Sequence, residues 1–411
     1  MFWRYWTAMA VSNAGTAITT VALPLVAVTT LHAPAFQVSL LTAAIYLAWA
    51  LIGLPAGVLV ARLPLRGTQI AMDLVRAVAI ASIPLAWWLG HLTMTHLVLA
   101  AFMVSLANVV FDVGSATFLP AIVPRDELTA RNSLVSATYS TTSLGGPSLG
   151  GVIVQLLGAV PTLLIDVVSF VFSAVLLRGL PPGRPAAPAE TRLTTQIREG
   201  WRFVTRHPVM RPCMIAATTD NFANGALMAL IPVFLVRDML AQPALVGLLI
   251  AADGAGALLG ATLATRLITR YGSARVTLAA TIAGAACALL MPAGHGGAGL
   301  VLFAVGNIGF GCGVVVFSIA ARTHRQVASP PELLSRVMAT VRFVSWGGIP
   351  FGALTGGAVA TAIGTRGALW VACALTLIAP VVLWFSPVRL LRSLAEETVP
   401  DRTGETSSVR S

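Results

Sequence analysis

Long apolar segments separated by short polar connections make up almost the whole chain. An α-helix needs about 20 apolar residues to cross the core of a bilayer, and each segment is about that long. The expected spans lie at roughly 6–30, 37–61, 68–89, 96–118, 133–158, 161–180, 209–236, 244–265, 273–292, 298–320, 337–363 and 367–386. The pattern therefore predicts an all-α integral membrane protein with twelve transmembrane helices.

Two polar stretches interrupt this pattern. The longest connection, at about 181–208, is rich in proline where it begins, which indicates a cytoplasmic linker. Its second part, 194–205, is polar with two aromatic residues and predicts a short helix on the membrane surface. The polar stretch 387–411 predicts a disordered cytoplasmic tail. These boundaries leave two six-helix bundles, at 1–180 and 209–386.

The composition supports a membrane protein. Hydrophobic residues make up 57% of the chain and charged residues only 10%, which is too few polar side chains to cover a soluble enzyme. The net charge of +11 does not indicate nucleic-acid binding, because the arginines follow the topology. With the N-terminus inside, 24 of the 26 arginines fall on the cytoplasmic side, and only Arg237 and Arg366 fall outside. The positive-inside rule then predicts a multi-pass protein of the cell membrane with both termini cytoplasmic.

The two halves of the chain resemble each other. The cytoplasmic segment 124–131 matches the segment 329–336, and a helix rich in glycine and proline follows each, at 145–151 and 347–352. A parallel repeat of six helices is a transporter architecture, with the substrate site between the halves near the membrane midplane.

These features together resemble a known family. Twelve spans in a 6+6 arrangement with a long central loop resemble the major facilitator superfamily. The helix 5 sequence Gly146-Pro-Ser-Leu-Gly-Gly151 resembles the antiporter motif of its exporters. The segments 119–132 and 332–338 resemble the macrolide-efflux and enterobactin-exporter group. The resemblance covers roughly 1–386 and implies the major facilitator fold and a role in drug efflux.

The antiporter motif has a physical interpretation. Its glycines allow another helix to approach closely, and its proline removes a backbone hydrogen bond and kinks the helix. In the exporters that the chain resembles, the kink shapes the pocket and prevents leakage. The alternative is ordinary packing by small residues. The motif residues are Gly146, Pro147, Gly150 and Gly151.

Three acids lie within predicted spans, namely Asp220, Asp253 and Asp166. A charged carboxylate at the bilayer centre costs about 2.5–3.5 kcal/mol on insertion scales, so it usually faces a cavity or a partner. We expect these acids to be candidates for proton coupling. The alternative is a structural hydrogen bond to a neighbouring helix.

A second charged group lies toward the cytoplasmic ends of helices 2 to 4. The loop sequence from Gly57 to Arg62 resembles a loop of the superfamily, although alanine precedes the arginine where an acid is usual. Two charged residues of helix 3 stand three positions apart and share one helical face. We expect a cytoplasmic gate that holds the outward-open state, with interfacial anchoring as the alternative. The gate candidates are Gly57, Arg62, Asp73, Arg76 and Asp112.

Several polar and aromatic residues inside the spans are candidates for lining a substrate cavity, with packing as the alternative. They are Asn13, Tyr46, Asn108, Tyr139, Asn221, Asn224 and Asn307, and the tryptophans Trp49 and Trp346 have the same character. Arg342 lies deep enough in helix 11 to bind an acid. The four cysteines are widely spaced and show no metal-like pairing, so we expect neither a metal nor a cofactor.

The leading hypothesis is a secondary exporter of apolar or amphipathic small molecules that works by alternating access, as a monomer, in exchange for protons. Such substrates include drugs, antibiotics, siderophores and secondary metabolites. The chain lacks the G-x-x-x-x-G-K-[ST] loop of ATP-driven proteins. Uptake by proton symport is the runner-up, and the antiporter motif argues against it. A polytopic membrane enzyme would need a cluster of catalytic polar groups, and none is evident.

Overall fold

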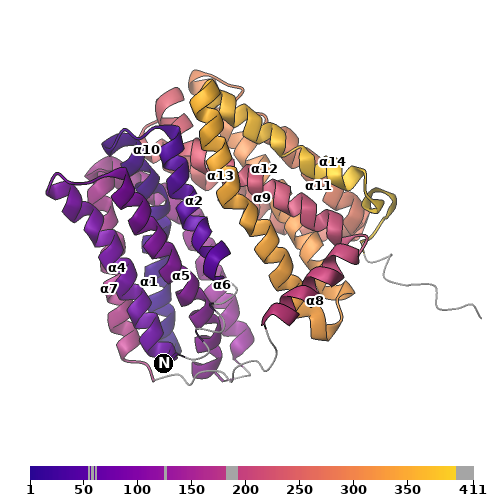
Figure 1. Ribbon diagram of the computed structural model, residues 1–411, viewed down its shortest axis with the longest axis horizontal. Coiled ribbons are helices and arrows are strands. Elements are labelled where there is room, and N and C mark those ends of the chain that lie inside the picture. The colour runs from indigo at the N-terminus through magenta and orange to yellow at the C-terminus, as the bar shows by residue number, and fades with distance from the viewer. Residues whose placement is uncertain (54–55, 57–59, 61–62, 125–126, 182–192, 395–411) are drawn as a thin grey trace, which may run out of the picture.

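The computed structural model describes residues 1–53, 56, 60, 63–124, 127–181 and 193–394. Within these residues the regular structure is entirely helical, and two helical bundles stand side by side (Figure 1). The predicted linker residues 182–192 and the tail 395–411 lie outside the described residues.

The first half supplies the left bundle in Figure 1. Its helices are α1 (Phe2–Leu25), α2 (Ala35–Ile52), α4 (Leu65–Trp88), α5 (Met94–Ile122), α6 (Leu128–Leu157) and α7 (Ala159–Arg178).

The second half supplies the right bundle, with the amphipathic helix α8 (Leu193–Arg206) at its lower end. Its remaining helices are α9 (Met210–Val233), α10 (Pro243–Tyr271), α11 (Ser273–Ala288), α12 (Gly296–Ala328), α13 (Pro331–Leu375) and α14 (Ile378–Trp384). The long helix α13 contains two helices that meet at Gly364, where φ is 78°.

Nine stretches of the described chain are long and apolar enough to cross a membrane, and the last of them contains the two helices joined at Gly364. Helices α6 and α11 complete the predicted twelve. Helix α11 is short, whereas α6 is rich in serine, threonine and glycine. The hydroxyl groups of Thr138, Thr141 and Thr142 donate to carbonyls of α6 itself, and the hydroxyl of Thr138 also accepts from the indole N–H of Trp6 on α1 at 3.0 Å.

The backbone repeats itself in the two halves. Helix α1 continues into the π-helical turn η1 (Val26–Thr30), and α9 continues into η2 (Phe234–Asp238). After each turn comes a non-glycine residue in the left-handed region, His32 with φ 50° and Leu240 with φ 51°. Because two such unusual turns recur at equivalent positions, the two six-helix pseudo-repeats are confirmed in the backbone.

The two ends of the molecule differ in how the halves are joined. We call the end that carries Arg4, Arg66 and Arg131 the arginine-rich face, and the other end the opposite face; the N-terminus lies at the arginine-rich face (Figure 1). One large apolar core contains residues of both halves, such as Val26 and Phe234 near the opposite face. Toward the arginine-rich face, separate apolar clusters lie within each half. The halves are therefore packed together mainly at the opposite face.

Candidate transport site

The antiporter-motif residues of α6 contact two different helices. A Cβ atom added at Gly150 would lie 3.0 Å from the carbonyl oxygen of Ile18 on α1, and Gly146 likewise faces α1. A Cβ atom at Gly151 would lie 2.9 Å from Cα of Gly247 on α10, in the other half. The motif therefore brings α6 close to α1 within the first half and to α10 across the interface.

Pro147 lies within α6, and its carbonyl oxygen is close to Gly247 of α10. The neighbouring Gly145 has open space where a Cβ atom would lie. The close approach is thus specific to one face of the helix. The suggested role of the motif in export stays a prediction.

Polar contacts reinforce the junction at the opposite face. The side-chain amide of Gln155 donates to Oε1 of Gln242 at 3.3 Å, and Oε1 of Gln155 accepts from the backbone N–H of Ala244 at 3.2 Å. A guanidinium N–H of Arg237 donates to the carbonyl oxygen of Ala33 at 2.6 Å. Each contact joins one half to the other, so all three must break if the halves separate at this face.

The two arginines that depart from the charge pattern therefore have structural partners. Arg237 bridges the halves, as described above. Arg366 donates to the carbonyl oxygens of Gly294 at 2.7 Å and Pro292 at 3.0 Å, and its guanidinium group lies 5.1 Å from the ring centroid of Phe234. Backbone carbonyls thus satisfy both side chains, which explains their place at the opposite face.

Charged and aromatic side chains from both halves meet near the middle of the molecule. The guanidinium carbon of Arg342 on α13 lies 4.5 Å from the ring centroid of Trp346 and 4.9 Å from that of Trp49 on α2. Asp112 and Tyr139, from α5 and α6, lie within electrostatic range of Arg342. We call these five residues the central cluster. Asp112 is exposed, as are Tyr139 at 53% and Trp346 at 38%.

A second contact between the halves involves Asp253. The hydroxyl of Tyr46 on α2 donates to the sulfur of Met228 on α9 at 3.3 Å, and Asp253 on α10 lies within electrostatic range of Tyr46. The carboxylate of Asp253 packs against Gly311 of α12. Within the described residues it has no hydrogen-bond partner. Asn224 also reaches Met228, at 3.9 Å, and joins this group.

The other two predicted proton carriers lie inside the separate halves. Asp166 on α7 is buried and accepts hydrogen bonds from the hydroxyls of Thr19 at 2.6 Å and Ser169 at 3.0 Å. Asp220 on α9 lines a cavity of about 10 Å³ between α9, α11 and α12, which has room for about one water molecule. No side chain of the described chain bonds to its carboxylate. The three acids therefore occupy three different environments.

The charged residues of α4 form a buried ion pair within the first half. Arg76 pairs with Asp73, and another of its N–H groups donates to Oδ1 of Asn108 at 3.0 Å. Asp73 also accepts from the hydroxyl of Ser173 at 2.7 Å. The guanidinium carbon of Arg76 lies between two rings, 4.0 Å from Phe111 and 4.5 Å from Phe170.

This position differs from the expected one. Arg76 stands near the middle of α4, and the pair faces α5 and α7 instead of the second half. Of the other gate candidates, Asp112 lies within electrostatic range of Arg76 and of Arg342, whereas Gly57 and Arg62 lie outside the described residues. A role of these residues in gating stays a prediction.

The remaining asparagines differ in their surroundings. Asn307 is buried and donates to the carbonyl oxygen of Leu249 at 2.9 Å, and Asn221 donates to Ala217 of its own helix at 2.9 Å. The amide nitrogen of Asn13 is buried without a partner among the described residues. Asn307 therefore fits packing better than substrate contact. The aromatic partners of Arg76, Phe111 and Phe170, carried no signal in the sequence beyond their apolar character.

The whole chain can be compared with known proteins. The sequence profile of the family described as transmembrane secretion effector matches residues 1–405. The chain belongs to this family of the major facilitator superfamily. An uncharacterized MFS-type transporter, y4rN of Sinorhizobium fredii, is 30% identical over 295 residues, which cover 71% of this chain and 72% of the relative. The protein is therefore a multi-pass membrane transporter and not an enzyme.

Other relatives support the fold and suggest efflux. The multidrug efflux pump Tap of Mycolicibacterium fortuitum is 25% identical over 367 residues, which cover 86% of this chain and 87% of the pump. Among solved structures, the nucleoside transporter NupG aligns with a TM-score of 0.72 at 13% identity, over 93% of this chain and 98% of its own. A bacterial homologue of the iron transporter ferroportin, in an inward-facing state, aligns with a TM-score of 0.74 at 18% identity over the same shares. These two structures share the fold.

Proposed function

We propose that this transporter is a secondary active exporter that moves amphipathic small molecules out of the cytoplasm in exchange for protons. The observation that carries the proposal is the asymmetry between the two ends. The halves touch backbone to backbone through Gly151 and Gly247 near the opposite face, while most of the central cluster is exposed and only Trp49 is half-buried. We infer that this conformation takes up substrate from the arginine-rich face, which is cytoplasmic. Similarity to the Tap pump supports the outward direction.

The central cluster supports an amphipathic substrate. Trp49, Trp346 and Tyr139 offer flat apolar surfaces, and Asp112 and Arg342 offer charges of both signs. Pockets of this kind use the apolar area for affinity and a few polar groups for orientation. A molecule with an aromatic body and one charged group, such as a planar aromatic cation, would satisfy both. Its positive charge would be attracted by Asp112, which forms no ion pair within the described residues.

Among the three acids, Asp253 fits proton coupling best. It lies at the contact between the halves, beside Tyr46 of the other half, and has no hydrogen-bond partner among the described residues. A proton there changes the charge at a surface that alternating access must rearrange, so protonation would favour one conformation over the other. Asp220 is the second candidate. The carboxylate of Asp166 is buried and accepts hydrogen bonds from two hydroxyl groups, which favours a structural role for this acid.

The coupling proposal predicts a split between two transport modes. In proteoliposomes with ethidium as the probe, Asp253→Asn should lower pH-driven uphill export at least about tenfold, because a neutral side chain carries no proton. Counterflow of ethidium without a pH gradient should stay within about threefold of wild type, since exchange needs no net proton transfer. Glu127→Gln, which neutralises an exposed acid, is the matched control.

Two outcomes of this experiment contradict the proposal. If Asp253→Asn concentrates ethidium at the wild-type rate, Asp253 is not the proton carrier, and Asp220→Asn tests the next candidate. If wild-type protein moves ethidium in the same direction as protons, the transporter is a symporter and the export proposal fails.

The proposed orientation of the protein in the membrane gives a separate prediction. In a background without the four native cysteines, cysteines are placed at His91 in the α4–α5 turn and at Thr269 near the end of α10, both exposed positions. The His91 cysteine should react with an impermeant maleimide added to intact cells, and the Thr269 cysteine only after permeabilisation, because the arginine-rich face is cytoplasmic. Gel shifts report both reactions. The reverse pattern would place the termini outside.

A further inference from the structure

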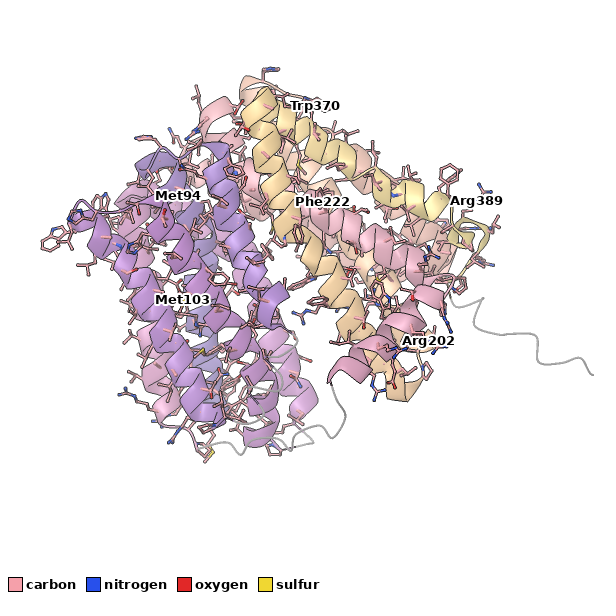
Figure 2. All side chains as sticks on the ribbon, in the orientation of Figure 1. Met94, Met103, Arg202, Phe222, Trp370 and Arg389 are labelled. Atoms are coloured by element: carbon pink, nitrogen blue, oxygen red, sulfur yellow. The ribbon has the colours of Figure 1, made fainter. Side chains whose placement is uncertain are left out.

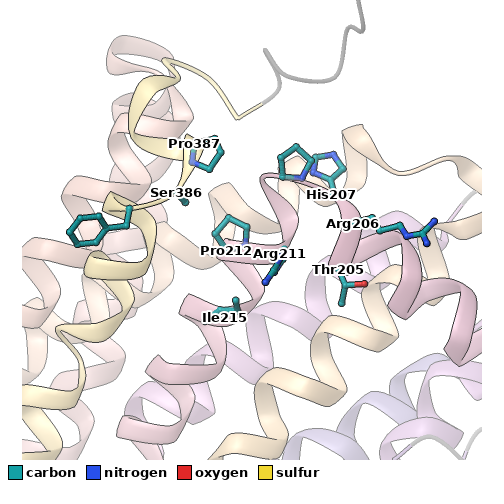
Figure 3. Close-up of a pocket in the computed structure, with 10 residues that line it drawn as sticks. Thr205, Arg206, His207, Arg211, Pro212, Ile215, Ser386 and Pro387 are labelled. Carbon is teal, nitrogen blue, oxygen red and sulfur yellow. The ribbon is translucent and has the colours of Figure 1, made fainter.

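A pocket lies on the arginine-rich side of the second half, away from the central cluster. It has a volume of about 350 Å³ and lies between the α8–α9 connection and the end of α14 (Figure 3). Arg206, His207 and Arg211 are among the lining residues, Ile215 lies one turn beyond Arg211 on α9, and Phe385 lies across from them at the end of α14 (Figure 3). The pocket thus combines cationic and apolar walls.

Among the described residues, no acid pairs with the cationic residues of the pocket. Arg206 and Arg211 are exposed, and neither forms an ion pair within the described part of the chain. The Nδ1 atom of His207 accepts the backbone N–H groups of Val209 and Met210, both at 3.2 Å. These bonds place the ring proton on Nε2 in the neutral form, and burial lowers the pKa of His207 and favours that form. Two guanidinium groups and an imidazole N–H therefore remain as donors for an anion.

The apolar wall lies where a bilayer would begin. Phe385, at the end of α14, is 82% exposed, and Ile215 on α9 is also exposed. The neighbouring helix α8 buries Val204 against the bundle and leaves Ile197 and Trp201 exposed. An amphipathic helix of this kind lies in the interface between headgroups and acyl chains. Figure 2 shows Arg202 of α8 and Arg389 beyond α14 at this end of the second half, far from Trp370 at the other.

We propose that this pocket binds an anionic phospholipid. Its phosphate lies against Arg211 and His207, and its acyl chains lie along Ile215 and Phe385. The guanidinium group of Arg206 extends away from the pocket in Figure 3 and adds positive charge at the rim. Basic pockets between transmembrane helices on the cytoplasmic side bind anionic headgroups in this way. A free phosphate has the same charge and oxygens, but it would make no use of the apolar wall. The site is independent of the proposed export function.

The test compares probes on the full-length protein purified in a neutral detergent. Native mass spectrometry measures binding of dioctanoyl phosphatidylglycerol, dioctanoyl phosphatidylcholine and inorganic phosphate. Phosphatidylglycerol should bind at least about tenfold more tightly than phosphatidylcholine, and Arg206→Gln with Arg211→Gln should remove about that factor. The matched control, Arg270→Gln with Arg275→Gln, removes two exposed arginines from the same face and should change binding less than about threefold.

A second variant separates a lipid from a soluble anion. Phe385→Ser leaves the charges in place and should weaken phosphatidylglycerol binding several-fold, because the acyl chains lose apolar contact. Three results would overturn the proposal. They are equal loss in the control variant, equal binding of the two lipids, and displacement of phosphatidylglycerol by inorganic phosphate at the same concentration, which would indicate a site for a soluble anion.

Discussion

Replacing Arg76 by alanine is expected to remove most of the folded protein. The guanidinium group is the counter-charge of Asp73, which is fully buried in the first half. Without the guanidinium group, the carboxylate of Asp73 keeps only the hydrogen bond from the hydroxyl of Ser173. The contacts of the guanidinium group with the rings of Phe111 and Phe170 are lost as well. Removing one partner of a buried ion pair costs about 3–5 kcal/mol, a large share of the about 5–15 kcal/mol that stabilises a typical folded protein.

The measurement is the yield and thermal midpoint of the protein extracted in a mild detergent. Arg131→Ala is the matched control, because Arg131 also pairs with an acid one helical turn away, Glu127, but in an exposed position where the pair contributes about 0–1 kcal/mol. Replacing both members, with Asp73→Leu and Arg76→Met, should recover part of the loss, since no charge is then left unpaired. Equal midpoints for Arg76→Ala and Arg131→Ala would show that the buried pair does not stabilise the first half.

Replacing Gly151 by alanine is expected to open the junction at the opposite face. The added methyl group would lie 2.9 Å from Cα of Gly247, and backbone atoms on both sides cannot move away cheaply. Overpacking of this kind costs about 1–3 kcal/mol. The strain exists only where the halves are closed together, so it should shift the population toward the state open at this face by about fivefold to a hundredfold.

Gly145→Ala is the control for this prediction, because the same methyl group there meets open space on the same helix. Spin labels at Gln155 and Gln242, which touch across the junction, report its opening as a longer distance in pulsed electron paramagnetic resonance. Export of ethidium should fall in parallel with the shift. Unchanged distances in Gly151→Ala would mean that α6 and α10 accommodate the methyl group without opening, which would contradict the prediction.

The two predictions concern different levels of the structure. The Asp73–Arg76 pair stabilises one half from within, whereas Gly151 and Arg237 hold the halves against each other. The halves share an apolar core near the opposite face, and close glycine contacts and single hydrogen bonds across the junction add to it.

The sequence alone determined the architecture. A helix in a bilayer must satisfy its own backbone hydrogen bonds, so the length of each apolar segment already specifies its secondary structure. The less apolar helix α6 and the short helix α11 were also predicted, from the apolar segments at 133–158 and 273–292. The internal repeat reappears in the backbone as the matching turns at His32 and Leu240. The amphipathic helix α8 also followed from local composition.

Only the tertiary structure decided the surroundings of each polar side chain. Asp166, Asp220 and Asp253 look alike in sequence, yet one is enclosed by hydroxyl groups, one lines a small cavity and one lies between the halves. The periodicity of a helix shows which residues share a face, but not which neighbour that face meets. For that reason Arg76 and Asp73 were expected near a cytoplasmic helix end, whereas the structure places them as a buried pair near the middle of α4. The partners that decide these roles come from helices far away in the chain, and only packing brings them together.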